Sequence, residues 1–293
     1  MTESLVRNFR PFDPTHPVAV IGAGVMGAKV AWASARAGVP TRLYDVSAPA
    51  LQAAVERILG WSEGAERERL AANLAGTERL DDALAGTQLA FENVPEDLAL
   101  KRSVLADLDA RLGADAYLGS NASALPCSPL AAATQRPDRF FNMNWSDPRT
   151  SRLVELMGSP KTDPGTIAFA LGWARRIGMI PILVRQEQMG YSFNRIWRVI
   201  KKEVLRQIEA GVATPEDIDR AWMLAFGMGY GPCGLMDRVS LPSIRKVELA
   251  YFADTGDSSD RPPAFLDRMI AEGRGFYHNP DPEYRDPDWL TAG

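Results

Sequence analysis

Short apolar runs alternate with amphipathic helical patterns along roughly the first two thirds of the chain. This alternation is typical of a largely parallel sheet with helices packed on its faces. The predicted strands are residues 18–21, a run ending at Asp45, and residues 88–93, 117–120, 139–144, 153–157 and 182–184. The predicted helices between them include residues 48–61, 98–112 and 164–177.

The pattern changes near residues 185–190, after which only helical periodicity continues. A long helix is predicted over residues 194–211, and Thr214 with Pro215 gives the N-cap and first position of another. Residues 279–288 are rich in Pro and Asp and are expected to form an extended tail. We therefore expect an α/β Rossmann-type doubly wound sheet over residues 1–186 and an all-α domain over residues 187–293.

The first predicted strand leads directly into a glycine-rich loop and a helix. A GxGxxG motif alone is weak evidence, but strand, loop, helix, strand and acid in register predict a dinucleotide site. The first glycine permits a tight turn, the second lets the backbone approach a pyrophosphate, and the third lets the helix pack close to the strand. The loop residues expected at the phosphates are Gly22, Gly24, Val25, Met26 and Gly27.

An acidic residue, Asp45, ends the second predicted strand. A carboxylate at this position accepts hydrogen bonds from the adenosine ribose hydroxyls and repels a 2′-phosphate. The expected cofactor is therefore NAD rather than NADP.

The composition of the chain argues against several other classes of function. The chain has 293 residues, 46% of them hydrophobic and 24% charged, as in an ordinary globular protein. A formal net charge of −4 argues against a nucleic-acid partner. The two cysteines, Cys127 and Cys233, form no metal or disulfide motif, so we expect no metal and a cytoplasmic location. No apolar run suits a membrane span, and residues 1–17 are expected to be a flexible or docked leader rather than a signal peptide.

Polar residues gather where the predicted strands end, which is the ligand-binding edge of an open α/β sheet. Most of them also suit a structural role: Glu96 could cap a helix, Asn121 and Ser123 suit a turn, and Asp147 precedes a proline. Glu155 differs, because it lies inside a predicted buried strand, where an unpaired charge is costly. It is therefore expected to serve a site.

Several motifs together resemble the 3-hydroxyacyl-CoA dehydrogenase family over about residues 17–277. They are the glycine loop, Glu96 with Lys101, 121–123 (NAS), 144–148 (NWSDP), 153–155 (LVE), Asn194 with Arg195, 215–219 (PEDID), 229–232 (GYGP) and 273–277 (GRGFY). The resemblance implies an NAD-dependent dehydrogenase that oxidises a secondary hydroxyl, with the substrate between the domains and a homodimer formed through the helical domain. It also implies that Glu96, Lys101 and Asn121 bind the cofactor, and that Ser123 and Asn194 bind substrate oxygens.

The chain departs from the family at the catalytic base. The family's histidine is replaced by Asn144, and the family's asparagine three residues later is Asp147; the glutamate that orients the histidine matches Glu155. Neither His16 nor His278 is in register. An amide has no usable pKa, although it can still donate or accept a hydrogen bond.

Three accounts of the altered centre follow. First, Asp147 or Glu155, with its pKa raised by burial, could have become the acid/base. Second, the reaction could need little proton transfer from the protein, as with an iminium substrate of an imine or enamine reductase. Third, the chain could bind NAD without turnover.

The substrate side of the resemblance is also altered. Residues 61–86 are short for the family's CoA-binding hairpin, and acids interleave with Arg67 and Arg69 there, which is a poor phosphate site. We expect a small hydroxy acid or an acyl group on a carrier protein; an acyl thioester is not excluded. The aromatic residues expected near the cleft, as pocket walls or as core, are Tyr191, Phe193, Trp197 and Trp222.

Overall fold

The computed structural model describes residues 9–277, so the tail predicted over residues 279–288 lies outside the described residues. The chain divides into two compact units, Met1–Ser192 and Phe193–Gly293.

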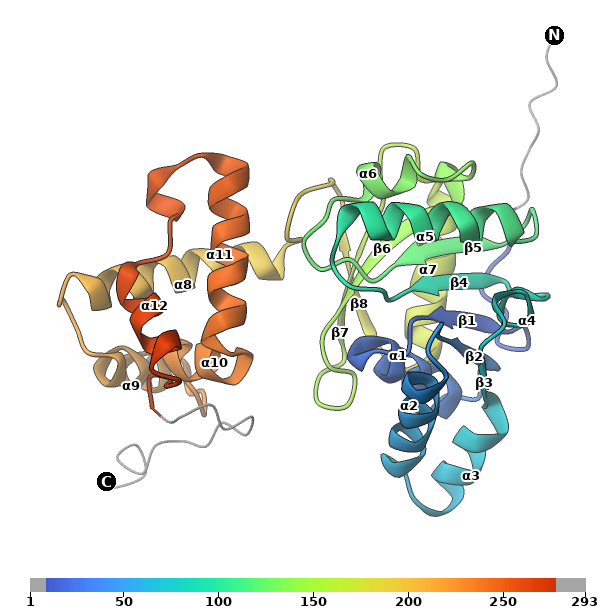
Figure 1. Ribbon diagram of the computed structural model, residues 1–293, viewed down its shortest axis with the longest axis horizontal. Helices are drawn as coiled ribbons and strands as arrows, with labels where there is room; N and C mark the ends of the chain where they lie inside the picture. Colours follow the sequence, from blue (N-terminus) through green and yellow to red (C-terminus); the bar gives the residue numbers. More distant parts are fainter. Residues whose placement is uncertain (1–8, 278–293) are drawn as a thin grey trace, which may run out of the picture. The chain divides into compact units, whose positions relative to one another are not determined.

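The first unit is built on an eight-stranded sheet with the order β3-β2-β1-β4-β5-β6-β7-β8 (Figure 1). Its strands are β1 (Val18–Ile21), β2 (Thr41–Tyr44), β3 (Leu74–Thr77), β4 (Leu89–Glu92), β5 (Tyr117–Ser120), β6 (Phe140–Trp145), β7 (Leu153–Met157) and β8 (Ile180–Val184). Neighbouring strands are parallel except β6 and β7. The connection over residues 146–152 is too short for a crossover, so these two strands form an antiparallel pair.

Helices cover both faces of this sheet (Figure 1). They are α1 (Val25–Arg36), α2 (Ala48–Gly60), α3 (Gly64–Asn73), α4 (Leu80–Leu84), α5 (Leu98–Arg111), α6 (Cys127–Ala131) and α7 (Pro164–Arg176). Apolar residues of α1, α2 and α7 share one core cluster with one side of the sheet, and those of α4, α5 and α6 share a second cluster with the other side. The expected doubly wound fold is confirmed.

The predicted strands match closely, with one omission, and the short helices α4 and α6 were not predicted. Ser47 caps α2 by accepting a hydrogen bond from Ala50, and Asp163 caps α7, which starts at Pro164. The omitted strand is β3, a half-exposed strand of sequence LAGT beside β2. The strand predicted as third, over residues 88–93, is therefore the fourth.

The described part of the leader is docked on the first unit. Phe12 packs edge-on against Phe169 with ring centroids 5.7 Å apart. The Tyr117 hydroxyl donates to the carbonyl of Arg10 at 2.9 Å, and Gln88 accepts from the backbone N–H of Asp13 at 3.1 Å. Of the two alternatives for the leader, residues 9–17 follow the docked one.

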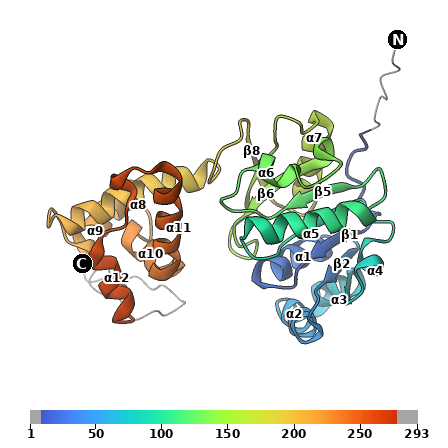
Figure 2. The same ribbon diagram turned by 45° about the horizontal axis from the view of Figure 1, so that its top comes forward.

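The second unit contains only helices within its described residues (Figure 2). They are α8 (Phe193–Glu209), α9 (Pro215–Phe226), α10 (Pro232–Val239), α11 (Leu241–Thr255) and α12 (Ala264–Ala271), with a short 3-10 turn at Ser258–Asp260. Thr214 caps α9 as predicted. The core includes Leu205, Met236 and Leu266. Among residues 9–277, no helix is long and apolar enough to cross a bilayer.

Candidate functional site

The glycine loop joins β1 to α1, and two of its glycines, Gly22 and Gly27, have no room for a larger side chain. Gly22 has a φ of +100°, which favours glycine, and a Cβ there would lie 3.0 Å from the carbonyl oxygen of Asn93. A Cβ at Gly27 would lie 1.8 Å from the carbonyl oxygen of Gly22. The first turn of α1 is thereby held directly against the loop.

Gly24 stands in open space at the start of α1. A Cβ there would meet nothing within 4 Å, and no side chain caps the helix at this residue. Backbone N–H groups at a helix N-terminus attract phosphate, and the missing Cβ lets a pyrophosphate approach. The residues present therefore fit a dinucleotide.

Asp45 lies on the other side of the cradle, the name used for the glycine loop of residues 22–27 at the start of α1. Its carboxylate accepts the N–H of Ala23 at 2.7 Å and the N–H of Ser47 at 2.9 Å. The acid follows β2 directly and is bound to the glycine loop itself. Its position beside the loop suits the ribose contact predicted from the sequence.

Lys101 lies in a buried ion pair at the end of β4. Its ammonium is 2.9 and 3.1 Å from the two carboxylate oxygens of Glu92, 3.1 Å from the carbonyl of Val94 and 3.5 Å from Glu96. Burial raises the pKa of Glu92, and the charge of Lys101 and a hydrogen bond from Ser120 oppose that rise. The predicted cofactor role of Lys101 stays a prediction; its geometry is that of an internal counter-ion.

Glu96 ties together the loops that follow β4 and β5. One of its carboxylate oxygens accepts the backbone N–H groups of Ser123 and Ala124, each at 2.9 Å. The amide of Asn121 donates to the side-chain oxygen of Asn93 at 2.9 Å. The structure thus brings Glu96, Asn121 and Ser123 together at the carboxyl edge of the sheet.

Asn144 and Glu155 face each other across β6 and β7. They are register partners, and the Asn144 amide nitrogen lies 3.3 Å from the Glu155 carboxylate. Glu155 is 2% exposed and also accepts the N–H of Ser192 at 3.0 Å, whereas Asn144 is half-buried. The sequence expectation that Glu155 needs a partner is met by these two donors.

Tyr191, for which the sequence left a pocket wall and a core role open, is buried in the core beside Ser192. It is fully buried, has a φ of +53°, and donates its hydroxyl to the carbonyl of Ala122 at 2.8 Å. Such a backbone conformation is strained for a tyrosine and persists only where packing holds it. It delivers the N–H of Ser192 to Glu155, and Tyr191 is core rather than a pocket wall.

Asp147 does not have the environment of a general acid. Burial alone would raise the pKa of Asp147, but the hydrogen bond from Lys29 and the positive charges of Lys29 and Arg149 outweigh it. The pKa consequently lies below its ordinary value. The hypothesis that burial raises the pKa of Asp147 for acid/base work is therefore wrong.

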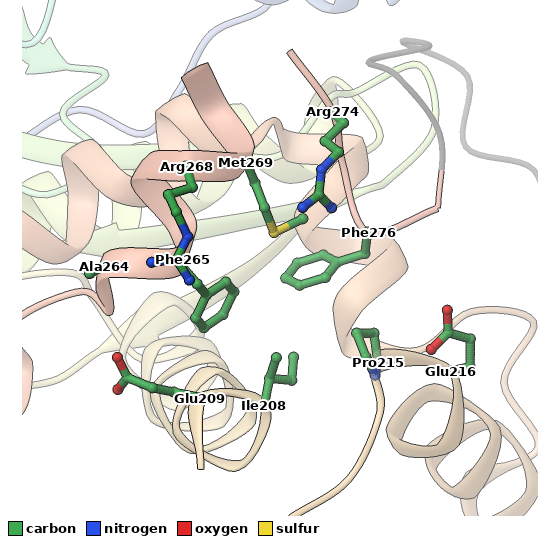
Figure 3. Close-up of a pocket in the computed structure, with 10 residues that line it drawn as sticks. All are labelled: Ile208, Glu209, Pro215, Glu216, Ala264, Phe265, Arg268, Met269, Arg274 and Phe276. Carbon is green, nitrogen blue, oxygen red and sulfur yellow. The ribbon is translucent and has the colours of Figure 1, made fainter. Parts of the chain in front are cut away.

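The remaining predicted residues lie in the second unit. Asn194 is at the start of α8, and its substrate role stays a prediction. Trp197 packs against the core of this unit, and Trp222 lies 4.7 Å from Phe226 between ring centroids. A cavity of about 470 Å³ in this unit is lined by residues such as Arg268, Met269 and Phe276, and by none of the predicted site residues (Figure 3). Residues 9–277 hold no group of three His, Cys, Asp or Glu side chains suited to a metal.

Comparison with known proteins agrees with the geometry of both units. The family model described as 3-hydroxyacyl-CoA dehydrogenase, NAD binding domain, matches residues 17–188. The model for the C-terminal domain of the same family matches residues 190–282. The chain belongs to the 3-hydroxyacyl-CoA dehydrogenase family.

Individual relatives differ in substrate. The chain is 32% identical to 5-formyl-3-hydroxy-2-methylpyridine 4-carboxylate 5-dehydrogenase of Mesorhizobium japonicum, over 88% of the chain and 87% of that protein. It is also 32% identical to 3-hydroxybutyryl-CoA dehydrogenase of Mycobacterium tuberculosis, over 90% and 99%. The structure of (S)-3-hydroxybutyryl-CoA dehydrogenase from Ralstonia eutropha superposes with a TM-score of 0.84 at 28% identity, covering 91% and 100%.

Family membership settles the cofactor and the reaction class. The protein is an NAD-dependent oxidoreductase of the 3-hydroxyacyl-CoA dehydrogenase type. The glycine cradle and Asp45 are the parts of the described structure that fit NAD.

Two substitutions in the cradle should separate binding from folding. Gly24→Ala should leave the melting temperature unchanged, because its Cβ meets no protein atom, while NAD affinity falls about tenfold or more. Gly27→Ala should lower both, with a stability loss of about 1–3 kcal/mol from overpacking. Calorimetric titration and thermal melts measure the two effects. Equal NAD affinity in wild type and Gly24→Ala would contradict the assignment.

Removing the charge of Lys101 should expose the cost of burying Glu92. Lys101→Met should destabilise the protein by about 3–5 kcal/mol near neutral pH, because Glu92 is left without its counter-ion. In that variant the folded-state pKa of Glu92 rises further above its unfolded value, so protonation relieves the penalty. The loss relative to wild type should shrink as the pH falls from about 8 to about 5.

Denaturant melts at several pH values provide the measurement. The matched control is the double variant Lys101→Met with Glu92→Gln, which removes both charges and should lose less stability than Lys101→Met alone. A pH-independent loss in the single variant would show that Lys101 stabilises through packing instead.

Proposed function

We propose that this protein transfers hydride between NAD and a small hydroxy or oxo acid, with Asn144 as the hydrogen-bonding group at the reacting oxygen. The observation that carries the proposal is the Asn144–Glu155 contact of 3.3 Å between register partners on β6 and β7. A carboxylate only accepts hydrogen bonds, so Glu155 orients the amide with its nitrogen inward. This contact supports the assignment of Asn144 and Glu155 to the position of the family's His–Glu pair.

This pair favours binding chemistry over proton abstraction. The second N–H of Asn144 can donate to a carbonyl oxygen, and its own oxygen can accept from a hydroxyl, but neither takes a proton at neutral pH. When bound, NAD supplies the hydride acceptor. The ion pair with Lys29 keeps Asp147 ionised. Glu155 is buried and accepts hydrogen bonds from the amide of Asn144 and the backbone N–H of Ser192. We therefore favour the account in which solvent or the substrate exchanges the proton.

The segment between α2 and β4 supports the proposal that the substrate does not carry CoA. Arg36 pairs with Glu66 at 3.0 Å, and Arg67 donates to the carbonyl of Leu59 at 2.5 Å. These cations are already bound by acceptors of the protein, which leaves a poor site for nucleotide phosphates. The relative from Mesorhizobium japonicum, named for a pyridine carboxylate, shows the same degree of identity as the CoA-named relative.

The finer assignments follow from this proposal. Ser123 and Asn194 would contact substrate oxygens, and residues 187–293 would form the substrate and dimerisation domain. Exposed apolar side chains on α8 and α9, including Ile196, Leu224 and Phe226, support a homodimer formed through the helical unit. Both cysteines are free and buried, in keeping with a cytoplasmic location.

Restoring the histidine tests the role of Asn144. Asn144→His places an imidazole beside Glu155, so NAD-dependent oxidation of 3-hydroxybutyryl-CoA or 3-hydroxybutyrate should rise at least about 100-fold over wild type. Stopped assays of NADH formation measure it, and the ratio of the two substrates reports on CoA. The control Asn144→His with Glu155→Gln should lose most of the gain, because the imidazole is no longer oriented. No gain in Asn144→His would refute the proposed position of Asn144.

The oligomeric state tests the exposed face of the helical unit. The wild type should run as a dimer in light scattering, and Leu224→Glu should shift it toward monomer, because a charge would be buried at the interface. Ile180→Glu, at an exposed apolar residue of β8, is the matched control and should stay dimeric. A monomeric wild type would rule the dimer out.

A further inference from the structure

The turn between β6 and β7 is organised by Asp147. One oxygen of the Asp147 carboxylate accepts the N–H of Arg149 at 3.0 Å. The backbone carbonyl of Asp147 accepts the N–H groups of Thr150 and Ser151 at 3.0 and 2.8 Å. The strands on either side carry Asn144 and Glu155. The position of this turn therefore affects where the pair is held.

The Asp147 carboxylate also contacts α1, the cofactor helix, whose N-terminus is expected to face the phosphates of NAD. Its other oxygen lies 2.8 Å from the ammonium of Lys29, with the two side chains only 33% and 17% exposed. Lys29 lies in the second turn of α1, which follows the phosphate-facing Gly24. An ion pair shielded to this degree is screened less by solvent than one on the surface.

A second contact fixes the turn on the same side. The guanidinium of Arg149 lies 4.6 Å from the ring centroid of Trp61, which ends α2. Trp61 in turn meets Trp32 of α1 edge-on at 6.4 Å. The turn is thus attached to α1 directly and through α2.

We propose that Lys29 is a positioning residue that anchors the β6–β7 turn to the cofactor helix and so sets the Asn144–Glu155 pair relative to the nicotinamide half of NAD. In a doubly wound sheet the adenosine half lies over β2 and the other half lies over the β4–β6 side, with the pyrophosphate at α1 between them. Lys29 connects the helix at the pyrophosphate with the hairpin on the nicotinamide side. The inference rests on the proposed role of Asn144.

The test compares two ligands that differ only in the nicotinamide. Lys29→Met should weaken NADH binding about tenfold, because the hairpin loses its anchor, and should change ADP-ribose binding less than twofold. Asp147→Asn should behave like Lys29→Met, and the double variant should be no worse than either single variant, because both remove one interaction. Lys29→Arg, which keeps the charge, should recover most of the NADH affinity. Calorimetric titration of the full chain measures all of these.

The outcomes separate positioning from simple support of the fold. Equal weakening of NADH and ADP-ribose, or of neither, would overturn the proposal, as would additive losses in the double variant. If Lys29→Met melts below the assay temperature, Lys29→Gln replaces it with the same expectation. Because no turnover is needed, failure here is distinct from failure of Asn144→His to gain activity.

Discussion

Buried carboxylates at the carboxyl edge of the sheet place a strict demand on the first unit, since each must receive hydrogen-bond donors. The buried Glu92 accepts from the ammonium of Lys101, and the buried Glu155 accepts from Asn144 and Ser192. The exposed Glu96 likewise accepts two N–H groups of the loop after β5. In each case the donor comes from a separate loop or element. The hydrogen bonds that these acids require therefore bring together the segments that form the site.

The same demand limits what the acids can do. A carboxylate that already accepts from several N–H groups is held in place, which suits orientation better than proton exchange. Asp147 shows this most clearly, because Lys29 lowers its pKa despite its partial burial. The described contacts at this edge are thus those of oriented donors and fixed acceptors.

The sequence predicted the parts of the fold that rest on local pattern. The apolar strands, the capped helices and the glycine loop with Asp45 each carry their signal within a few residues. β3 did not, because a half-exposed strand of four residues containing glycine has neither a hydrophobic run nor alternation. The reversal of β7 was readable only from the shortness of the turn that precedes it.

The candidate site was predictable in its residues and not in their partners. The resemblance linked the positions of Asn144 and Glu155, but the contact between these two side chains depends on the register of two antiparallel strands. Lys29 carried no signal, because an exposed-looking lysine inside a helix gives no sign of an acid over a hundred residues later. The backbone conformation of Tyr191 was unforeseen for another reason: a left-handed backbone at a tyrosine is a product of packing.

Under the proposed assignment, in which Asn144 takes the place of the family's histidine, the site would keep its architecture. An imidazole and a primary amide both offer an N–H to Glu155, so the buried acid keeps a donor from β6 in either case. Such an exchange would remove the proton affinity near neutral pH and would leave a second N–H donor and a carbonyl acceptor at the same place. The hydrogen bond to Glu155 would be preserved, and the change in chemistry would fall on the side of the amide that faces away from Glu155.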